Sequence, residues 1–384
     1  MKRLLSVISA LSLMTVYSCS DDTGPIVNIT DFGAVGDGIT DNTEAINSAI
    51  AAAPEGAAVI VPAGRFLSGT IHLKSHMTFR LEDGSEITGT GNLDGYDCYH
   101  PSRDMSRYDS GVGTRNANVA SDARWTRALI IGQNLEDVAI TGKGTINGMH
   151  VRDSLGEESM RGPHAILLAE CSNVRLSGFS VRCASNYAIL GYELTASVMD
   201  RLDIREGWDG IHVRGCRDLI IKDCDIQSGD DAIAGGYWEN IEIRDCSLNS
   251  SCNGIRMIEP GKNVLINGCR IYGPGIFPHR SSSAERGHSS IYAIVLEPGG
   301  WGPAPGRTEN VIIRNCTVEN MLSVIVYSMG EDNSCSGLTI ENVNAYGITY
   351  NTTPLNRQEC PRMWDNISIR NYNITSCPKD NIKQ

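Results

Sequence analysis

Apolar and polar residues alternate in short runs along most of the chain, and these runs return in nearly the same form. The clearest copies begin at residues 217, 239, 262 and 309 and read "RDLIIKDCDI", "ENIEIRDCSL", "KNVLINGCRI" and "ENVIIRNCTV". Weaker copies extend the pattern from about residue 136 to the C-terminal end. Alternation with a period of two is typical of β-strands that bury one face. We therefore predict a chain of many short strands.

The length of the repeat indicates how these strands are arranged. Successive copies lie about 22 residues apart, which leaves no room for a helix between strands. Such a repeat predicts the coils of a parallel β-solenoid, an all-β fold in which each coil buries its apolar positions against the next. Residues one coil apart should then stack in columns. The expected interior column is Ile211, Ile233 and Ile255, and the expected outward column beside it is His212, Ala234 and Arg256.

The segment before the repeats carries a helix signal. Asp41 is followed three residues later by Glu44 and by an apolar run, a capping-box-like start for a helix that ends near Ala53. The open end of a solenoid exposes its core. We expect this helix to cover that end.

The stretch from Gly91 to Arg127 interrupts the repeat. It contains five arginines, at positions 103, 107, 115, 124 and 127. Long insertions of this kind often carry function. We expect the insertion to form a wall over one face of the solenoid, and the alternative is a solvated arginine-rich loop.

The composition narrows the class of protein. The chain has 384 residues, of which 41% are hydrophobic, with 40 glycines and only 5 phenylalanines, which favours many tight turns and thin strands. The formal net charge is -12. Because phosphate binding needs a basic face, this charge argues against a nucleic-acid partner.

The first residues indicate export. Two basic residues precede an apolar run from Leu4 to Tyr17, and Cys19 follows. This arrangement resembles a bacterial lipoprotein signal whose cysteine is lipidated; an ordinary cleaved signal with an incidental cysteine is the alternative. We expect an export signal at 1–19, a linker at 20–26 and a single β-helix domain at 27–384. The protein would be an outer-membrane or cell-surface lipoprotein, or otherwise periplasmic or secreted.

The chain has 13 cysteines, and their spacing separates two groups. Buried thiols behave as small hydrophobic groups. We expect a row of such thiols at the same position of successive repeats, formed by Cys224, Cys246, Cys269 and Cys316. Cys360 and Cys377, near the end, are the expected disulfide of an exported chain.

Three aspartates interrupt the apolar pattern within one coil length. Asp209 stands in "GWDGI", and Asp230 and Asp231 stand one coil later in "SGDDAI". A single aspartate in a solenoid is more often a turn residue that caps backbone amides. Three stacked carboxylates disfavour joint ionisation, so we interpret them as a catalytic group. Asp230 and Asp231 can face one cleft only if the backbone turns after Ser228 and Gly229.

The order of several motifs is similar to that of a known family. The opening "DFGAVGDGITDNTEAI", "VIVPAGRF", "AITGKGTING", and "WDGI" and "SGDDAI" one coil apart resemble the polygalacturonase family of glycoside hydrolases, over nearly the whole mature chain. The resemblance implies a right-handed parallel β-helix of the pectin lyase-like superfamily and hydrolysis with inversion. It assigns the general acid to Asp230 and the attacking water to Asp209 and Asp231. This chemistry needs no metal or organic cofactor.

The chain departs from this family at the motifs that surround the acids. Of the motif Asn-Thr-Asp only Asp209 is kept, after Trp208, which could stack on a sugar. Cys252 and Asn253 stand where Gly-His-Gly is expected, and "SIYAIVLEP" stands where Arg-Ile-Lys is expected. The basic residues that grip a galacturonate are therefore missing. Unmodified polygalacturonate becomes a doubtful substrate.

Other residues could replace the missing positive charge and contact the substrate. His212 and Arg256 share the outward column beside the acids. Arg280, Arg286 and His288 stand in the irregular insert "GIFPHRSSSAERGHSS". The alternative for the two column residues is an ordinary solvated face. We expect substrate contacts from Trp208, His212, Cys252, Asn253, Arg256 and Arg286.

Three acids without the basic motifs predict a hydrolase with altered recognition, acting on a pectin-related or other plant or algal polysaccharide or oligosaccharide. One alternative is a polysaccharide lyase, with Ca²⁺-binding acids and Arg256 as the base. Another is a carbohydrate-binding β-helix without catalysis. The expected partner is the glycan, with no nucleic acid, a membrane contact only through the lipid anchor, and a monomeric state.

Overall fold

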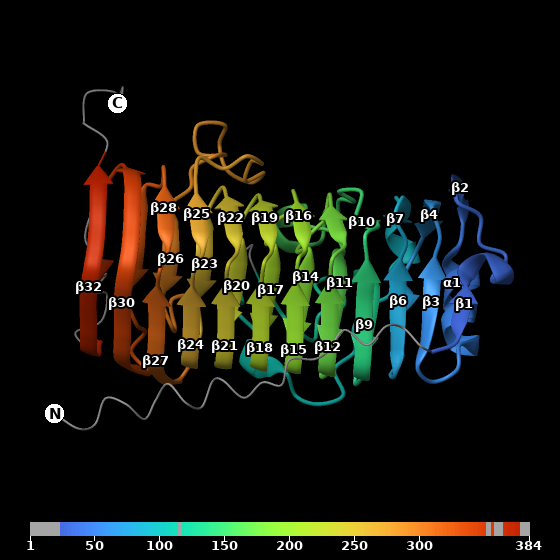
Figure 1. The fold of residues 1–384 in the computed structure, drawn as a ribbon, viewed down its shortest axis with the longest axis horizontal. Helices are drawn as coiled ribbons and strands as arrows, with labels where there is room; N and C mark the ends of the chain where they lie inside the picture. The colour runs from blue at the N-terminus through green and yellow to red at the C-terminus, as the bar shows by residue number, and fades with distance from the viewer. Residues whose placement is uncertain (1–23, 114–116, 351–354, 357–363, 377–384) are drawn as a thin grey trace.

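The computed structural model of the chain describes residues 24–113, 117–350, 355–356 and 364–376. The strands coil into a long solenoid, with the N-terminal coils at one end and the C-terminal coils at the other (Figure 1). Most coils contribute three strands, and each strand pairs in parallel with its equivalents in the neighbouring coils. The predicted all-β parallel solenoid is confirmed. Within the described ranges, no helix is long and apolar enough to cross a bilayer.

The three stacks of strands are named by their order within a coil. The first stack consists of β1 (Ile26–Asn28), β3 (Ala57–Val61), β6 (Met77–Leu81), β9 (Glu136–Gly142), β12 (Ser172–Ser177), β15 (Thr195–Asp200), β18 (Arg217–Lys222), β21 (Trp238–Arg244), β24 (Gly261–Asn267), β27 (Gly306–Arg314), β30 (Asn333–Ile348) and β32 (Asp365–Ser376). The second consists of β2 (Asp37–Asp41), β4 (Gly64–Ser68), β7 (Ser85–Gly89), β10 (Thr145–Asn147), β13 (Ser180–Arg182), β16 (Asp203–Arg205), β19 (Asp225–Ser228), β22 (Ser247–Ser250), β25 (Arg270–Tyr272) and β28 (Thr317–Glu319), which pairs with the long β30. The third consists of β5 (Ile71–His72), β8 (Ala128–Gln133), β11 (His164–Ala169), β14 (Ile189–Tyr192), β17 (Ile211–Arg214), β20 (Ile233–Gly236), β23 (Asn253–Met257), β26 (Tyr292–Leu296), β29 (Ser323–Tyr327) and β31 (Leu355–Asn356).

The strand register confirms both predicted columns. Ile211 pairs with Ile233, and Ile233 pairs with Ile255. All three isoleucines are fully buried in the interior of the coil. The adjoining positions, occupied by His212, Ala234 and Arg256, pair in the same order. Alternation along each strand therefore directs the second column away from the core, onto the outer face of the third stack.

The repeat also encodes the bends of the first stack. The second residue of each clear repeat copy has a left-handed backbone, with φ of 54° at Asp218, 56° at Asn240, and 55° at both Asn263 and Asn310. Asparagine and aspartate tolerate this conformation better than other non-glycine residues. Each of the three asparagine side-chain amides donates to the preceding member, at 2.8, 2.9 and 3.0 Å along the row. We call these four residues the asparagine ladder.

The expected row of thiols is also present. Its members Cys224, Cys246, Cys269 and Cys316 are buried, and each thiol donates to the backbone carbonyl two residues before it. None of the cysteines in the described ranges forms a disulfide. Cys360 and Cys377, the expected disulfide, lie outside the described residues, and so does the expected export signal with Cys19.

Helix α1 (Thr43–Ala52) covers the N-terminal end of the solenoid, as expected (Figure 1). Its inner face buries Ile46 and Ile50. The predicted capping box is wrong, because the N-cap is Asn42 and not Asp41. The Asn42 side chain accepts a hydrogen bond from the Val35 amide at 2.6 Å, which ties it to the preceding loop. The described residues also include four short 3-10 helices in loops: η1 (Ile29–Phe32), η2 (Leu93–Gly95), η3 (Ser106–Tyr108) and η4 (Glu157–Ser159).

The insertion at 91–127 forms a wall against the outer face of the third stack, which confirms the first of the two expectations. Tyr99, Tyr108 and Trp125 of this segment are buried in an apolar cluster with Leu190 and Tyr192 of β14. This cluster lies outside the coil and is separate from the core inside it. The outer face beside the wall is therefore only partly open to solvent.

The arginines of this wall are mostly engaged with neighbouring side chains. Arg103 forms ion pairs with Glu170 and Glu193. Arg107 lies over the ring of Tyr237, and Arg127 pairs with Asp153 at 3.1 Å. Arg115 lies outside the described residues.

Candidate active site

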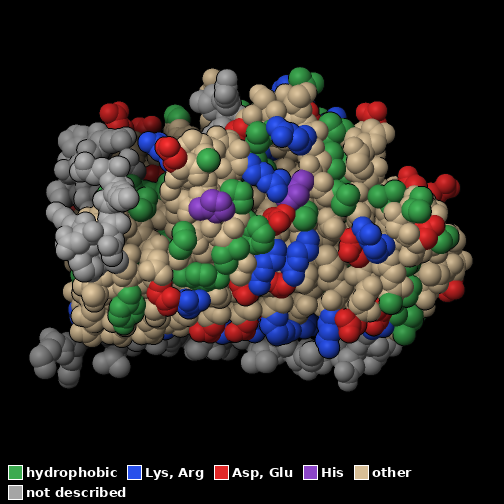
Figure 2. Space-filling model, turned by 90° about the horizontal axis from the view of Figure 1, so that it is seen from above, with side chains coloured by type: hydrophobic (Ala, Val, Ile, Leu, Met, Phe, Trp, Pro, Cys, Tyr) green, Lys and Arg blue, Asp and Glu red, His purple; other side chains and the backbone are tan. Residues whose placement is uncertain are grey.

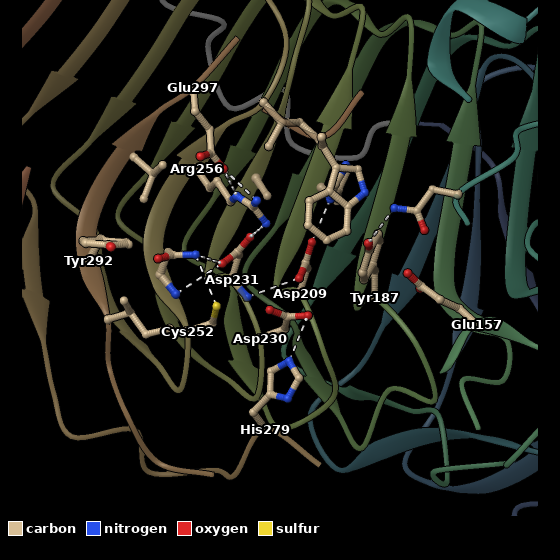
Figure 3. A pocket seen from close by; sticks show the side chains of 18 of the residues that line it. Glu157, Tyr187, Asp209, Asp230, Asp231, Cys252, Arg256, His279, Tyr292 and Glu297 are labelled. Carbon is tan, nitrogen blue, oxygen red and sulfur yellow. Dashed lines mark hydrogen bonds and ion pairs between the residues drawn. The ribbon is translucent and has the colours of Figure 1, made fainter. Parts of the chain in front are cut away.

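A cavity of about 320 Å³ lies on the outer face of the third stack, over β17, β20, β23 and β26. All three aspartates of interest line it, and their side chains converge in its centre (Figure 3). We call this cavity the aspartate pocket. Its lining residues are Asn118, Glu157, Glu158, Arg161, Tyr187, Asp209, His212, Asp230, Asp231, Ala234, Cys252, Asn253, Arg256, Ile258, His279, Ile291, Tyr292, Val295, Glu297 and Trp301.

The stacking of coils brings the acids together. Strand β19 ends at Ser228 and β20 begins at Ile233, so Asp230 and Asp231 lie in the bend between these strands, as predicted. Asp209 Oδ1 accepts a hydrogen bond from the backbone amide of Asp231 at 3.2 Å. Asp231 Oδ1 accepts the amide of Asn253 in the same way, also at 3.2 Å. Each side chain in this column therefore holds the backbone of the next coil.

Asp230 faces the positive charges of the pocket. Arg161 Nη2 lies 2.9 Å from Asp230 Oδ2, and His279 Nε2 lies 3.4 Å from the same oxygen. Burial alone would raise the pKa of Asp230, but the hydrogen bond from His279 and the charge of Arg161 outweigh burial and hold this pKa below its usual value. Asp230 is therefore the ionised member of the trio.

The pKa values of Asp209 and Asp231 shift in the opposite direction, above their usual value. Burial, followed by the charge of Asp230, raises the pKa of Asp209 well above its usual value. Burial likewise raises the pKa of Asp231 to about 8, although Arg256 works against this shift. Burial therefore favours the protonated forms of Asp209 and Asp231. The resemblance placed the acidic proton on Asp230 instead.

His212 positions Asp209 and is neutral. Its Nδ1 lies 2.7 Å from Asp209 Oδ2, and its ring stacks on Tyr187 with a centroid distance of 4.7 Å. Burial lowers the pKa of His212 to about 3. It therefore cannot replace a basic residue near neutral pH, and that expectation is wrong. Its Nε2 is buried and lacks a hydrogen-bond partner among the described residues, so it can bind a substrate hydroxyl.

Arg256 is held by acids of the chain itself. Its Nη2 lies 2.6 Å from Glu297 Oε1, and its Nη1 lies 3.6 Å from Asp231 Oδ2. Its guanidinium also lies over the ring of Trp301, 4.8 Å from the centroid. Arg256 therefore lines the pocket, as expected, but it is neither a solvated surface residue nor an unpaired cation.

Cys252 and Asn253 also line the pocket, as expected. Asn253 Nδ2 donates to Asp231 Oδ1 at 2.7 Å. Asn253 Oδ1 is buried and has no hydrogen-bond partner within the described part of the chain. Asn253 can therefore accept a hydrogen bond from a sugar hydroxyl while it holds Asp231 in place.

Trp208 does not line the aspartate pocket, so it does not stack on a sugar bound there. Only 2% of Trp208 is exposed, and the guanidinium of Arg161 lies 3.9 Å from the centre of its ring. The edge of the ring meets His279. Trp208 therefore supports the two cations that bind Asp230.

The irregular insert between β25 and β26 projects from the solenoid, and only part of it reaches the pocket (Figure 1). The expected substrate contact from Arg286 is wrong, because Arg286 lies on the exposed part of this loop and does not line the pocket. His288 Nδ1 binds the carbonyl of Gly275 at 2.7 Å. The insert contributes His279 instead, which the sequence reasoning missed.

Four further charged residues of the pocket were missed: Arg161, Glu157, Glu158 and Glu297. Arg161 Nη1 and Nε each lie 3.3 Å from a carboxylate oxygen, of Glu157 and Glu158 respectively. Burial raises the pKa of Glu157 to about 8. Arg161, Glu157 and Glu158 lie in the segment between β10 and β11, outside the repeat, where column reasoning gives no signal. Glu297 directly follows β26, and its role was overlooked although it stands in "SIYAIVLEP".

Two groups of side chains have the donor atoms for a metal ion. The ligand atoms of Asp230, Asp231 and Cys252 lie within 4.8 Å of one another, and so do those of His150, Cys183 and Glu206. Both sets include a thiol. A thiolate suits zinc better than calcium, which takes oxygen ligands.

Comparison with known proteins agrees with the fold. The family model "Right handed beta helix region" matches residues 138–293 and 187–358, which together span more than half of the chain. A second model, "Rhamnogalacturonase A/epimerase, pectate lyase-like", matches residues 26–94.

Curated relatives are similar over part of their length. A "Probable polygalacturonase" of Vitis vinifera is 30% identical over 238 residues, covering 57% of this chain and 45% of the relative. An "Exo-poly-alpha-D-galacturonosidase" of Dickeya chrysanthemi is 26% identical over 286 residues, covering 62% of this chain and 46% of the relative. This chain thus spans about half the length of these relatives.

Among solved structures, a family 28 exopolygalacturonase of Yersinia enterocolitica superimposes with a TM-score of 0.70 at 18% identity, covering 92% of this chain and 72% of that one. At this identity the likeness concerns the fold. The parallel stacks of strands agree with the family model that matches more than half of the chain. The chain therefore belongs to the right-handed β-helix family.

Proposed function

We propose that this protein is a glycoside hydrolase that cleaves a pectin-related polysaccharide or oligosaccharide. The observation that carries the proposal is the aspartate pocket, where three buried carboxyls converge and only Asp230 contacts Arg161 and His279. These contacts favour the charged form of Asp230, and burial favours the protonated forms of Asp209 and Asp231. Glycosidic hydrolysis needs one protonated carboxyl and one carboxylate on either side of the scissile bond. The relatives named polygalacturonase or galacturonosidase support a pectic substrate.

The reaction needs only water as a second substrate. A carboxyl proton moves to the glycosidic oxygen as the bond from that oxygen to the anomeric carbon breaks. An ionised carboxylate takes a proton from water, whose oxygen forms the new bond to the anomeric carbon. Attack opposite the leaving group inverts the anomeric configuration. His212 and Asn253, each with one buried unpartnered polar atom, are suited to orient the sugar.

The charges around Arg256 disfavour the lyase alternative. Burial alone would lower the pKa of Arg256, but the negative charges of Asp231 and Glu297 outweigh burial and raise it. Arg256 therefore stays protonated and is a poor base for removing a proton beside a uronate carboxyl.

A screen of the purified protein against pectic, galactan and algal glycans tests the proposal, with Asp230→Asn as the control. We expect new reducing ends from a pectic glycan with the native protein and at least about a hundredfold less with the variant. NMR of the first product should show inverted anomers. Unsaturated uronate products that disappear with a chelator would establish the lyase instead. Equal inactivity of both proteins on every glycan would leave the non-catalytic alternative.

We also propose that Cys19 is lipidated and anchors the protein to a membrane after export. The basic start, the apolar run and the following cysteine support this proposal. Metabolic labelling with a radioactive fatty acid tests it, with Cys19→Ala as the control. Equal labelling of both forms, or none of either, would contradict it.

A further inference from the structure

A second cavity, of about 650 Å³, lies beside the aspartate pocket. His279 lines both cavities, so they are separated by little more than one side chain. The second cavity is lined by His150, Val151, Arg152, Met160, Ser185, Trp208, Pro278, His279, Arg280, Ser282, Ser283, Ala284, Gly287 and His288. Neighbouring sugars of one glycan chain could therefore occupy the two cavities together.

Both arginines that line the aspartate pocket already contact acidic side chains, so neither is free to bind a substrate carboxylate. Arg161 is already placed between Asp230 and two glutamates, and Arg256 lies between Asp231 and Glu297. His279 contacts Asp230, and His212 is neutral. A uronate in this pocket would bring another negative charge beside buried carboxyls, with no unpaired cation among the described lining residues to balance it.

The second cavity has the opposite character. Its lining contains arginine and histidine but no aspartate or glutamate. Arg152 is exposed and has no ion-pair partner among the residues that the structure describes. Arg280 Nη2 lies 2.6 Å from His150 Nε2 and 3.7 Å from a carboxylate oxygen of Glu206, which also contacts His150. The positive charge of this cavity that no described carboxylate contacts is therefore that of Arg152. Figure 2 shows arginine, lysine and histidine side chains close to acidic ones over the middle of the solenoid.

We infer that the substrate places an uncharged sugar in the aspartate pocket and a uronate in the second cavity. This inference rests on the proposed hydrolase function and specifies its substrate class. A pectic backbone in which neutral sugars and uronates alternate presents both units to the two cavities at once. A chain made only of galacturonate must place a carboxylate among the acids, and an uncharged glycan leaves Arg152 without an ionic partner.

Kinetics on three glycans test the inference. The probes are a backbone of alternating rhamnose and galacturonate, the same backbone with its carboxyl groups reduced to alcohols, and polygalacturonate. We expect kcat/KM to be at least about tenfold higher on the alternating backbone than on either of the others, the effect of one charge-assisted contact. Equal or faster cleavage of polygalacturonate overturns the inference and leaves the hydrolase function in place. No cleavage of any probe by the native protein overturns both.

A pair of variants locates the effect. The double substitution Arg152→Gln and Arg280→Gln should raise KM for the alternating backbone about tenfold, change kcat less than about twofold, and abolish the preference over the carboxyl-reduced backbone. Arg286→Gln is the matched control, because this exposed arginine of the same loop lines neither cavity. A double variant that keeps the native preference for the carboxyl-containing backbone contradicts the assignment of the uronate to the second cavity.

Discussion

Two columns of side chains in this solenoid stack in the same way but have different roles. The asparagine ladder of the first stack and the column of Asp209, Asp231 and Asn253 beside the third stack each place a polar side chain on every coil. In the ladder, side-chain amides bind one another at the surface bends. In the column, carboxyls bind backbone amides and are almost fully buried, with 3% of Asp209 and of Asp231 exposed.

The difference shows that periodic stacking alone does not make a site. The ladder satisfies its own hydrogen bonds and leaves no unmatched charge. The carboxyl column differs from the ladder because loops outside the repeat cover it and add Arg161 and His279. Burial raises the pKa of Asp209 and of Asp231, whereas His279 and Arg161 lower the pKa of the neighbouring Asp230. Function therefore arises where the periodic column meets non-periodic loops.

The largest expected effect comes from removing the acid or the base of the aspartate pocket. Asp230→Asn and Asp231→Asn should each reduce kcat on the glycan by about 10²- to 10⁴-fold. The charges predict that Asp231 donates the proton. An aryl glycoside with a good leaving group should therefore restore most of the rate to Asp231→Asn and little to Asp230→Asn. Rescue of Asp230→Asn alone would instead give the acid role to Asp230, as the resemblance implies.

The scaffold and the acids were predictable from the sequence because they obey the repeat. Once the coil length is 22, the stacking of Ile211 on Ile233 and of Asp209 on Asp231 follows from counting. The same counting correctly placed Cys252 and Asn253 in the pocket.

The electrostatics of the site could not be predicted in this way. Whether Arg256 is an unpaired cation depends on Glu297, which directly follows β26 on the next coil and whose side-chain direction the sequence does not give. The neutrality of His212 depends on burial beneath the pocket, and the contact of His279 with Asp230 depends on how an irregular insert folds back. No spacing in the sequence encodes these contacts.

A smaller effect should appear in the pH dependence of stability. Asp231 has a pKa of about 8 in the folded protein and about 4 when unfolded, so the folded state binds the extra proton between these values. The free energy of unfolding contributed by this group is therefore present below about pH 4 and is lost as the pH rises towards 8. Denaturant unfolding across this range should give a shallower decline for Asp231→Asn than for the native protein.

The unfolding measurement on Asp231→Asn needs a matched control variant. Asp83→Asn, on an exposed turn, controls for the loss of one aspartate. Identical declines for the native protein and Asp231→Asn would show that Asp231 titrates no differently in the two states. The asparagine ladder, which carries one carboxyl at a solvent-facing bend, should add no comparable dependence.

The smallest expected effect lies in the asparagine ladder and tests whether it is purely structural. Asn263 donates to Asn240, accepts from Asn310, and has a left-handed backbone with φ of 55°. Asn263→Gly removes the two hydrogen bonds but tolerates this backbone, and should cost about 1 kcal/mol of stability. Asn263→Ala also strains the backbone and should cost about 1 kcal/mol more. Both should leave kcat/KM on the preferred glycan unchanged. Because the ladder lies on a different stack from the aspartate pocket, a fall in kcat/KM without unfolding would show that the two columns are coupled through the coil, contrary to the division drawn between them.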